Sequence, residues 1–210
     1  MKLKTKDFPL DNIFNIALKR VFDLLFSTFI IVFFLSWMYP IFGLIIKLQS
    51  RGPVIYKQLR EGKNGVHFWC FKFRSMYIDE VYDNSWTKVN DPRVTRFGVF
   101  LRRTSLDEFP QFLNVLLGNM SIVGPRPHPI KLNDLYRDRI QKFSFRHTTK
   151  PGVTGLSQMK GYRGSILKYH QINSRVKLDR FYIQNWTFLF DLKIILLTIP
   201  ATLHWGLSSK

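Results

Sequence analysis

The sequence predicts an α+β fold: a small, mainly helical domain with one short β-hairpin, an N-terminal re-entrant membrane helix and interfacial amphipathic helices. Three patterns predict it. A segment without charged side chains runs from Leu24 to Ile46. Two short β-type segments, 52–58 and 66–73, lie on either side of a turn. Apolar residues then recur at helical spacing from Phe109 to Leu117.

The composition indicates an anionic partner and contact with lipid. The 210 residues carry a formal net charge of +18, from 32 Lys and Arg against 14 Asp and Glu. Nucleic acid, an anionic membrane surface and phosphorylated small molecules all fit such a charge. Aromatic residues make up 16% of the chain, which is more than a soluble nucleic-acid binder needs and is typical of proteins that contact lipid. We therefore divide the chain into a membrane anchor, 1–48, and a domain, 49–210, that ends in an interfacial helix.

The uncharged segment predicts a helix that enters and leaves the membrane on the same side. It is long enough to span, but basic residues flank both of its ends, so the charge asymmetry that orients a true span is missing. The part before Pro40 would rise only about 24 Å as a helix, short of a roughly 30 Å hydrocarbon core. We expect a break at Pro40, with the freed backbone groups bonded by Ser36 or its neighbours. A single kinked span is the alternative.

The next segments predict a β-hairpin. GPVIYKQ and VHFWCFKF are rich in β-branched and aromatic residues, and the turn-forming REGKNG separates them. The single cysteine, Cys70, excludes an intrachain disulfide and a thiol-based metal cluster. We expect Cys70 to lie in the core.

An adjacent acid pair, Asp107 and Glu108, lies between arginines. One interpretation is structural, because Ser105 and Glu108 have the spacing of a capping box at the start of an amphipathic helix that Gly118 ends. The other is chemical, since a nucleophilic carboxylate surrounded by arginines suits phosphoryl transfer from an anionic substrate. The pair by itself leaves both interpretations open.

Two later segments predict surface contacts. The basic stretch from Lys131 to Lys150 lies between the loops GPRPHP and KPGVTG, so it is either a solvated face or a surface for anionic lipid or substrate. Asp191 and Lys193 interrupt the apolar C-terminal segment, which argues against a second span. We expect an interfacial amphipathic helix there, with a buried core helix as the alternative. Its apolar stripe comprises Leu189, Leu192, Leu196 and Ile199.

From about Lys19 to Leu197 the chain resembles the bacterial sugar transferase family of monotopic phosphoglycosyl transferases, also called polyprenyl-phosphate hexose-1-phosphate transferases. The matching runs are long and collinear: KRVFD, RGPVIYKQ, FKFRSM, DPRVTRFG, LRRTSLDEFPQFLNVLLGNMSIVGPRP, KPGVTG and YIQNW. No large domain precedes them, so we expect a minimal member of the family or part of one. Tyr39 stands before Pro40 where many relatives have serine, which affects the geometry expected for the break.

The resemblance implies an enzyme that moves a sugar 1-phosphate from a UDP-sugar to polyprenyl (undecaprenyl) phosphate and releases UMP. This reaction begins the assembly of exopolysaccharide, capsule or lipopolysaccharide. Asp107 matches the family's nucleophile, which holds the phosphosugar covalently, and Glu108 matches its partner. The family also implies Mg²⁺, for which Asp107 and Glu108 are the candidate ligands, one or both of them, and a bacterial inner (cytoplasmic) membrane location with the catalytic domain on the cytoplasmic face.

The basic positions of the family's site match Arg102 and Arg126, and Lys72 and Arg74 on FKFRSM are expected to converge on the same phosphates. Arg74 and Arg102 as ion-pair partners are the structural alternative. Two other functions compete with the enzyme. A basic membrane-surface scaffold would not need the acid pair, and a nucleic-acid binder would not need the uncharged N-terminal segment.

Overall fold

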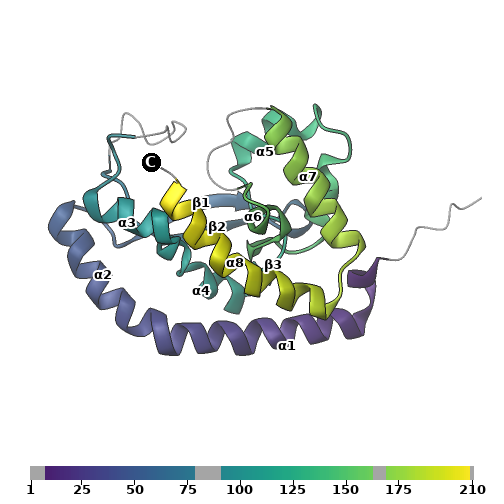
Figure 1. Cartoon of the computed structure of the whole chain (residues 1–210), viewed down its shortest axis with the longest axis horizontal. Helices are drawn as coiled ribbons and strands as arrows, with labels where there is room; N and C mark the ends of the chain where they lie inside the picture. Colours follow the sequence, from purple (N-terminus) through teal and green to yellow (C-terminus); the bar gives the residue numbers. More distant parts are fainter. Residues whose placement is uncertain (1–7, 79–90, 163–168, 209–210) are drawn as a thin grey trace, which may run out of the picture.

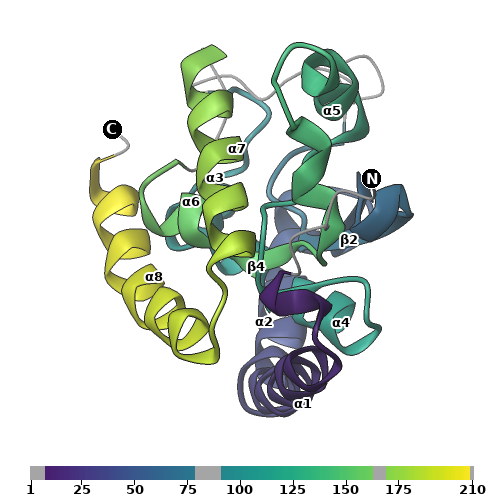
Figure 2. The ribbon, with the colours of Figure 1, turned by 90° about the vertical axis from the view of Figure 1, so that its right-hand side faces the viewer.

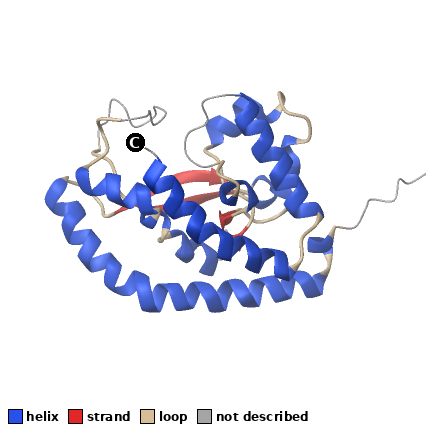
Figure 3. Cartoon of the chain, in the orientation of Figure 1, coloured by secondary structure: helices blue, strands red, loops and turns tan. Residues whose placement is uncertain are grey.

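The computed structural model describes residues 8–78, 91–162 and 169–208. Its elements are mostly helices, arranged around two small pairs of strands (Figure 1, Figure 3). This agrees with the predicted α+β class. The helices are α1 (Ile13–Ile30), α2 (Ser36–Gln49), α3 (Arg96–Thr104), α4 (Gln111–Leu116), α5 (Ile130–Arg137), α6 (Leu156–Met159), α7 (Tyr169–Gln184) and α8 (Phe188–Ser208). The strands are β1 (Ile55–Glu61), β2 (His67–Phe73), β3 (Ser121–Val123) and β4 (Gly152–Thr154).

The β-hairpin is confirmed, with a shifted first strand. β1 and β2 pair antiparallel, with Ile55 opposite Phe73 and Glu61 opposite His67. β1 begins three residues later than predicted and runs into the expected turn, because the chain reverses only at Asn64, whose φ is 55°. Cys70 is 1% exposed and lies in the main hydrophobic core, as expected.

The second pair of strands is parallel and was not predicted. β3 pairs with β4 through Ser121 opposite Gly152 and Val123 opposite Thr154. Each strand has three residues, too few for an alternation to be recognised in the sequence. The two backbones approach so closely that a Cβ on Gly152 would lie 2.1 Å from the Gly124 nitrogen, so only glycine fits there. The pair fixes the start of the loop that follows β3.

The N-terminal helix is continuous through Pro40, so the predicted break at Pro40 is wrong. α1 and α2 are joined by a π-helical turn, Ile31–Leu35, and Pro40 lies inside α2. A proline cannot bond the carbonyl four residues earlier and its ring crowds the preceding turn, so the irregularity falls before it. Two side chains of α2 bond backbone carbonyls of the π-helical turn. Ser36 Oγ donates to Val32 O at 2.6 Å, and Trp37 Nε1 donates to Phe33 O at 2.9 Å.

Within the described residues, one helix is long and apolar enough to cross a membrane. It comprises α1 and α2, Ile13–Gln49, with a mean hydropathy of 2.4 over its most apolar window. It bows around one edge of the molecule (Figure 1, Figure 2). Many large apolar side chains on its outer surface are exposed, including Val21, Leu25, Phe29, Val32, Phe33, Trp37, Ile41, Leu44 and Leu48.

Both halves of this helix are bound to the same domain. In α1, Lys19 Nζ pairs with Asp191 of α8, and Arg20 donates to the Val115 and Leu116 carbonyls at the end of α4. In α2, Gln49 Oε1 accepts from the Phe97 N–H of α3 at 3.1 Å. The two ends of the apolar helix therefore lie against one domain.

Asp191 explains why α8 is not a simple apolar helix. Its carboxylate is 1% exposed and accepts hydrogen bonds from Tyr182 Oη at 2.7 Å and Trp186 Nε1 at 3.0 Å, in addition to its ion pair with Lys19. Trp186 is therefore a buried anchor rather than an interfacial side chain. On the other side of α8, an exposed stripe consists of Leu189, Leu196 and Ile199.

Candidate active site

The acid pair lies in a tight turn between two helices. α3 ends at Thr104, Ser105 takes a left-handed conformation with φ 58°, and Leu106–Glu108 form a 3₁₀ turn before α4 begins at Gln111. The predicted capping box is wrong. The Ser105 N–H bonds to Arg102 O, and the Glu108 carboxylate points elsewhere. The sharp turn frees both carboxylates from helix capping.

A buried asparagine attaches α4 to the hairpin. Asn114 Oδ1 accepts from Phe71 N–H at 3.0 Å, and Asn114 Nδ2 donates to Trp69 O at 2.7 Å. The side-chain amide thus bonds the edge of β2 as a neighbouring strand would. Because Lys72 follows Phe71 in β2, this attachment brings its ammonium to the acid pair.

Glu108 is held by two cations from different elements. Lys72 Nζ lies 2.6 Å from Glu108 Oε1, and Arg126, in the loop after β3, forms a two-pronged contact at 2.6 and 3.1 Å. Burial by itself would raise the pKa of Glu108, but the charges of Arg126 and Lys72 hold it well below its ordinary value. The same pairing outweighs the burial of Arg126 and raises its pKa. Glu108 therefore stays ionised and fixes both cations.

Asp107 has the opposite electrostatic setting. It is 8% exposed, and burial, together with the neighbouring negative charge of Glu108, raises its pKa to about 6, even though Lys72, Arg102 and Arg126 favour ionisation. Two adjacent carboxylates whose environments push their pKa values apart are typical of an active site. Among the described residues, no lysine or arginine forms an ion pair with Asp107, whereas two form ion pairs with Glu108, so the Asp107 carboxylate is the one left open to a substrate.

The structure brings together Lys72, Glu108 and Arg126, but not all of the predicted phosphate-binding residues. Arg102 lies near Asp107, with its Nε donating to Ser75 Oγ at 2.8 Å. Arg74 does not reach the acid pair. Its guanidinium donates to the backbone carbonyls of Ser50 and Arg51 at the end of α2, where a cation is favourable. The prediction that Arg74 binds phosphate at this site is therefore wrong, and its observed partners are backbone carbonyls rather than the carboxylate that the ion-pair alternative expected.

The pocket beside Glu108 contains residues that the sequence reasoning missed. Besides the predicted residues, it is lined by Arg60, Cys70, Gln111 and Pro127. Gln111 is 2% exposed. The signal that could have pointed to it is a polar residue at a position that the helix buries, directly after the acid pair and Pro110.

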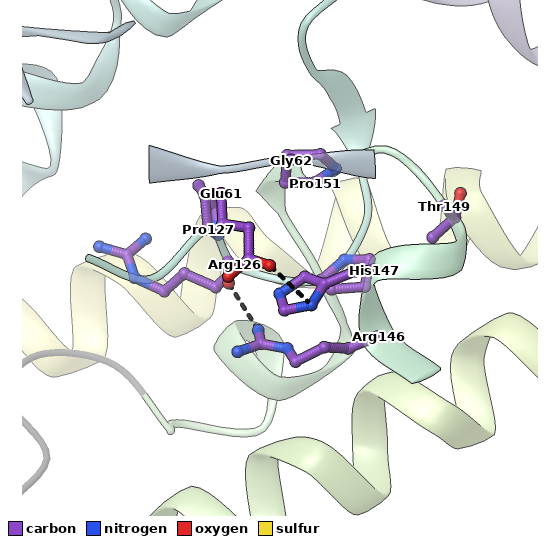
Figure 4. A pocket seen from close by; sticks show the side chains of 9 residues that line it. Glu61, Gly62, Arg126, Pro127, Arg146, His147, Thr149 and Pro151 are labelled. Carbon is purple, nitrogen blue, oxygen red and sulfur yellow. Dashed lines mark hydrogen bonds and ion pairs between the residues drawn. The ribbon is translucent and has the colours of Figure 1, made fainter. Parts of the chain in front are cut away.

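A second pocket is also lined by the proline loop, residues 124–129, which follows β3 (Figure 4). Its lining includes Glu61, Arg146 and His147, and it shares Arg126 and Pro127 with the first pocket. His147 Nδ1 lies 3.7 Å from a Glu61 carboxylate oxygen. Burial and the charge of Arg146 lower the pKa of His147 to about 4, so the ring is neutral near pH 7. Neither this ring nor the pocket contacts the acid pair.

The acid pair can contribute to a metal site but cannot form a complete one. Among the described residues, no group of three or more His, Cys, Asp or Glu side chains gathers. Magnesium is commonly held by one or two carboxylates plus substrate phosphates. Glu108 accepts three hydrogen bonds, which leaves about one of its four lone-pair positions free, and Asp107 adds a second carboxylate. These donors fit a magnesium ion that the substrate helps to bind.

Residues 14–205 match the family model described as bacterial sugar transferase. The chain belongs to the bacterial sugar transferase family. The resemblance seen in the sequence motifs is thereby confirmed over almost the whole chain.

Similar proteins of this family come from several bacteria. The UDP-glucose:undecaprenyl-phosphate glucose-1-phosphate transferase of Escherichia coli is 46% identical over 195 residues, which cover 92% of this chain and 41% of that protein. The exopolysaccharide production protein PSS of Rhizobium leguminosarum bv. phaseoli is 42% identical, with 91% of this chain and 98% of that protein covered. The galactosyl transferase CpsE of Streptococcus agalactiae is 42% identical, with 74% and 36% covered. The chain therefore spans about two fifths of the Escherichia coli relative.

Proposed function

We propose that this chain transfers a sugar 1-phosphate from a UDP-sugar to polyprenyl (undecaprenyl) phosphate and releases UMP, as the first step in assembling a polysaccharide or glycoconjugate. The observation that carries the proposal is the acid pair, in which Glu108 is fixed by Lys72 and Arg126 while Asp107 is left with a pKa near 6. The family's named members support the substrate class.

The proposed reaction has two displacements. A carboxylate oxygen of Asp107 attacks the phosphorus that bears the sugar, the bond from that phosphorus to the UMP oxygen breaks, and UMP leaves. A phosphate oxygen of the polyprenyl phosphate then attacks the same phosphorus, the acyl phosphate bond breaks, and Asp107 is free again. A covalent intermediate allows the soluble donor and the lipid acceptor to use one site in turn.

The cations around the acid pair supply electrostatic stabilisation. Lys72 and Arg126 are already oriented by Glu108, so they need little reorganisation when negative charge develops on the transferred phosphoryl group. Asp107 and Glu108 are the residues that would hold a magnesium ion, which would supply charge neutralisation at the diphosphate.

We propose a monotopic anchor on the cytoplasmic side of the inner membrane, and the contacts of the membrane helix support its monotopic character. Lys19 and Gln49 lie near opposite ends of the apolar helix, yet both bind the one folded domain. A straight span would place these ends across a roughly 30 Å hydrocarbon core. The exposed apolar faces of the bowed helix and of α8 would then lie in the lipid, with the acid pair within reach of a lipid phosphate.

The direct test is an assay of UMP release. Detergent-solubilised protein is mixed with magnesium, polyprenyl phosphate and, in parallel, UDP-glucose and UDP-galactose, the sugars suggested by the named relatives. We expect UMP release with at least one UDP-sugar and a polyprenyl diphosphate sugar as the lipid product. Folded protein that releases no UMP from any member of a wider UDP-sugar panel would contradict the proposal.

The rate should depend on pH through Asp107. Because its pKa is about 6 and only the carboxylate can attack, kcat/KM for the UDP-sugar should fall as the pH drops below about 6. Lys72→Gln removes a positive charge that favours ionisation, so it should move this acid limb to higher pH. The measurement is the pH profile of initial UMP release.

The control for the pH profile is Lys57→Gln. Lys57 lies on the adjacent strand, with its ammonium over the Phe71 ring, and we expect its loss to leave the limb in place. If kcat/KM instead falls only near pH 4, or falls at the same pH in wild type and in Lys72→Gln, Asp107 does not control the rate.

The monotopic anchor predicts a same-side labelling pattern. In a Cys70→Ser background, single cysteines placed at Lys4 and at Lys57 should react with an impermeant maleimide from the same side of sealed vesicles, because both ends of the helix return to one domain. Permeabilised vesicles give the full labelling level as control. Labelling from opposite sides in active protein would establish a spanning helix.

Pro40→Ala should shift the balance between the two topologies. It restores the missing backbone donor and relieves the crowding that precedes it, so the helix should straighten and span more readily. We expect the cysteine at Lys4 to become inaccessible from the Lys57 side in a fraction of the molecules, and UMP release to fall in parallel. Unchanged labelling would show that the same-side topology does not depend on Pro40.

A further inference from the structure

The loop that carries Arg126 has an unusual backbone. It reads Gly-Pro-Arg-Pro-His-Pro from Gly124 to Pro129. Its three prolines fix their own φ angles and restrict the residues before them, but they also remove three N–H donors. Such a loop cannot hold itself in place by ladder bonds along its own length. Donors from elsewhere in the molecule must bond its carbonyl groups.

Three successive carbonyls of the loop are each bonded by a different element. Pro125 O accepts from the Gly152 N–H of β4 at 2.9 Å. Arg126 O accepts from Arg146 Nη2 at 2.6 Å, and Pro127 O accepts from Arg60 Nη1 at 2.8 Å. The carbonyl of Arg126 and the one that follows it are thus each held by a guanidinium group, and the carbonyl before Arg126 is held by the backbone of β4.

Arg146 is itself buried and makes polar contacts with three other residues. Its side chain is 1% exposed and pairs with the equally buried Asp179 of α7 at 2.8 Å. It also contacts the His128 ring, with 3.2 Å between Arg146 Nη1 and His128 Nε2. Burial and the charge of Arg146 hold the pKa of His128 well below its ordinary value, so the neutral ring can accept a hydrogen bond. Arg146 belongs to the basic stretch for which a solvated face or a surface for lipid or substrate was expected, but its side chain lies in the interior.

We propose that Arg146 and Arg60 are positioning residues that form a guanidinium clamp on the backbone of the proline loop and so hold Arg126 in register with Glu108. The proposal rests on the proposed function for its kinetic consequence, but not for its structural one. Arg126 must place two nitrogens against one carboxylate while still facing the phosphate pocket. An ångström of misplacement is enough to lose such a contact, on the order of a hundredfold in rate.

The kinetic test is a double-mutant cycle between Arg146→Lys and Arg126→Ala. Lysine keeps the charge that faces Asp179, but its single ammonium cannot also hold the Arg126 carbonyl and the His128 ring as the planar fork does. We expect Arg146→Lys to lower kcat/KM for UMP release by roughly tenfold or more. In the Arg126→Ala background, the same change should have an effect within about twofold, because the side chain that it positions is gone.

The matched control is Arg137→Lys. Arg137 also pairs with a buried carboxylate, Glu61, at 2.8 Å, and in the part of the chain that the structure describes its hydrogen bonds go to Glu61 and none to the proline loop. We expect this variant to keep kcat/KM within about twofold of wild type. Equal rate losses from Arg146→Lys in the two backgrounds would overturn the clamp, since a general structural defect acts whether or not Arg126 is present.

A second measurement decides the structural claim without any turnover. The side chain of Arg126 is 22% exposed while it is paired with Glu108. Its rate of labelling by an arginine-specific dicarbonyl reagent therefore reports whether the guanidinium has left Glu108. Peptide mass spectrometry assigns the label to Arg126. We expect Arg126 to label several-fold faster in Arg146→Lys than in wild type or Arg137→Lys. If Arg146→Lys fails to fold, Arg60→Lys weakens the other guanidinium contact, with Pro127 O, and should increase the labelling rate of Arg126 in the same way.

Unchanged Arg126 labelling in a folded clamp variant overturns the inference even if the enzyme turns over. Faster labelling of Arg126 in the clamp variants, together with a wild-type protein that turns over no UDP-sugar, would support the clamp and contradict the proposed function. The two failures are therefore distinguishable.

Discussion

The Asp107→Asn variant is expected to release no UMP. An amide oxygen cannot form the acyl phosphate, so the first displacement has no nucleophile, and in a serine protease the loss of the nucleophile costs on the order of 10⁶-fold in kcat. The fold should be retained, because burial already favours the neutral form of this carboxyl, with its pKa near 6. Glu108→Gln should also be severely impaired, since it releases both Lys72 and Arg126.

Intact-protein mass spectrometry provides the decisive readout. Wild-type protein given a UDP-sugar without the lipid acceptor should gain one sugar phosphate, and Asp107→Asn should gain none. The control is Asp134→Asn, in which the lost carboxylate is 62% exposed and far along the chain from the pair. Near-wild-type turnover by Asp107→Asn would refute the covalent mechanism, and a dispensable acid pair in a folded, membrane-bound protein would favour the scaffold.

Arg126→Ala is expected to have the second-largest effect. It removes a two-pronged guanidinium from the phosphate pocket and leaves Glu108 with Lys72 as its remaining cation. If Arg126 stabilises charge that develops in the transition state, kcat should fall by roughly a hundredfold to a thousandfold, or about 2.7 to 4 kcal/mol. Arg126→Lys should recover only part of the loss, because lysine is a point charge without the planar fork.

The matched control is Arg103→Ala, which removes the same charge from an exposed position on α3. We expect little change in UMP release from it, since exposed charges at a distance are screened. The comparison uses kcat and KM for the UDP-sugar, measured at constant ionic strength. Full rescue by Arg126→Lys would reduce the role of this residue to that of a point charge.

The sequence by itself determined the parts that depend on local pattern. The hairpin follows from the β-rich runs around REGKNG, and the apolar helix follows from the uncharged segment that ends at Ile46. The family followed from long collinear motifs. Asp107 and Glu108 stood out because adjacent carboxylates are conspicuous between arginines in a chain of net charge +18.

Only the tertiary structure decided what depends on contacts between distant segments. Lys72, Glu108 and Arg126 meet because Asn114 attaches α4 to β2 and because β4 pairs with β3, and neither contact leaves a periodic signal. For the same reason Asp191 looked like an interruption of an apolar helix until its partner, Lys19, was placed beside it.

The two electrostatic roles within the acid pair, and the roles of the arginines, were also decided by packing. In sequence, Asp107 and Glu108 are equivalent carboxylates. Burial and the position of two cations separate their pKa values. Arg74 and Arg146 carry the same guanidinium as Arg126, but one ends up at the end of α2 and the other inside the domain behind the proline loop. A charge is a property of the residue, whereas its partner and its exposure to water are properties of the fold.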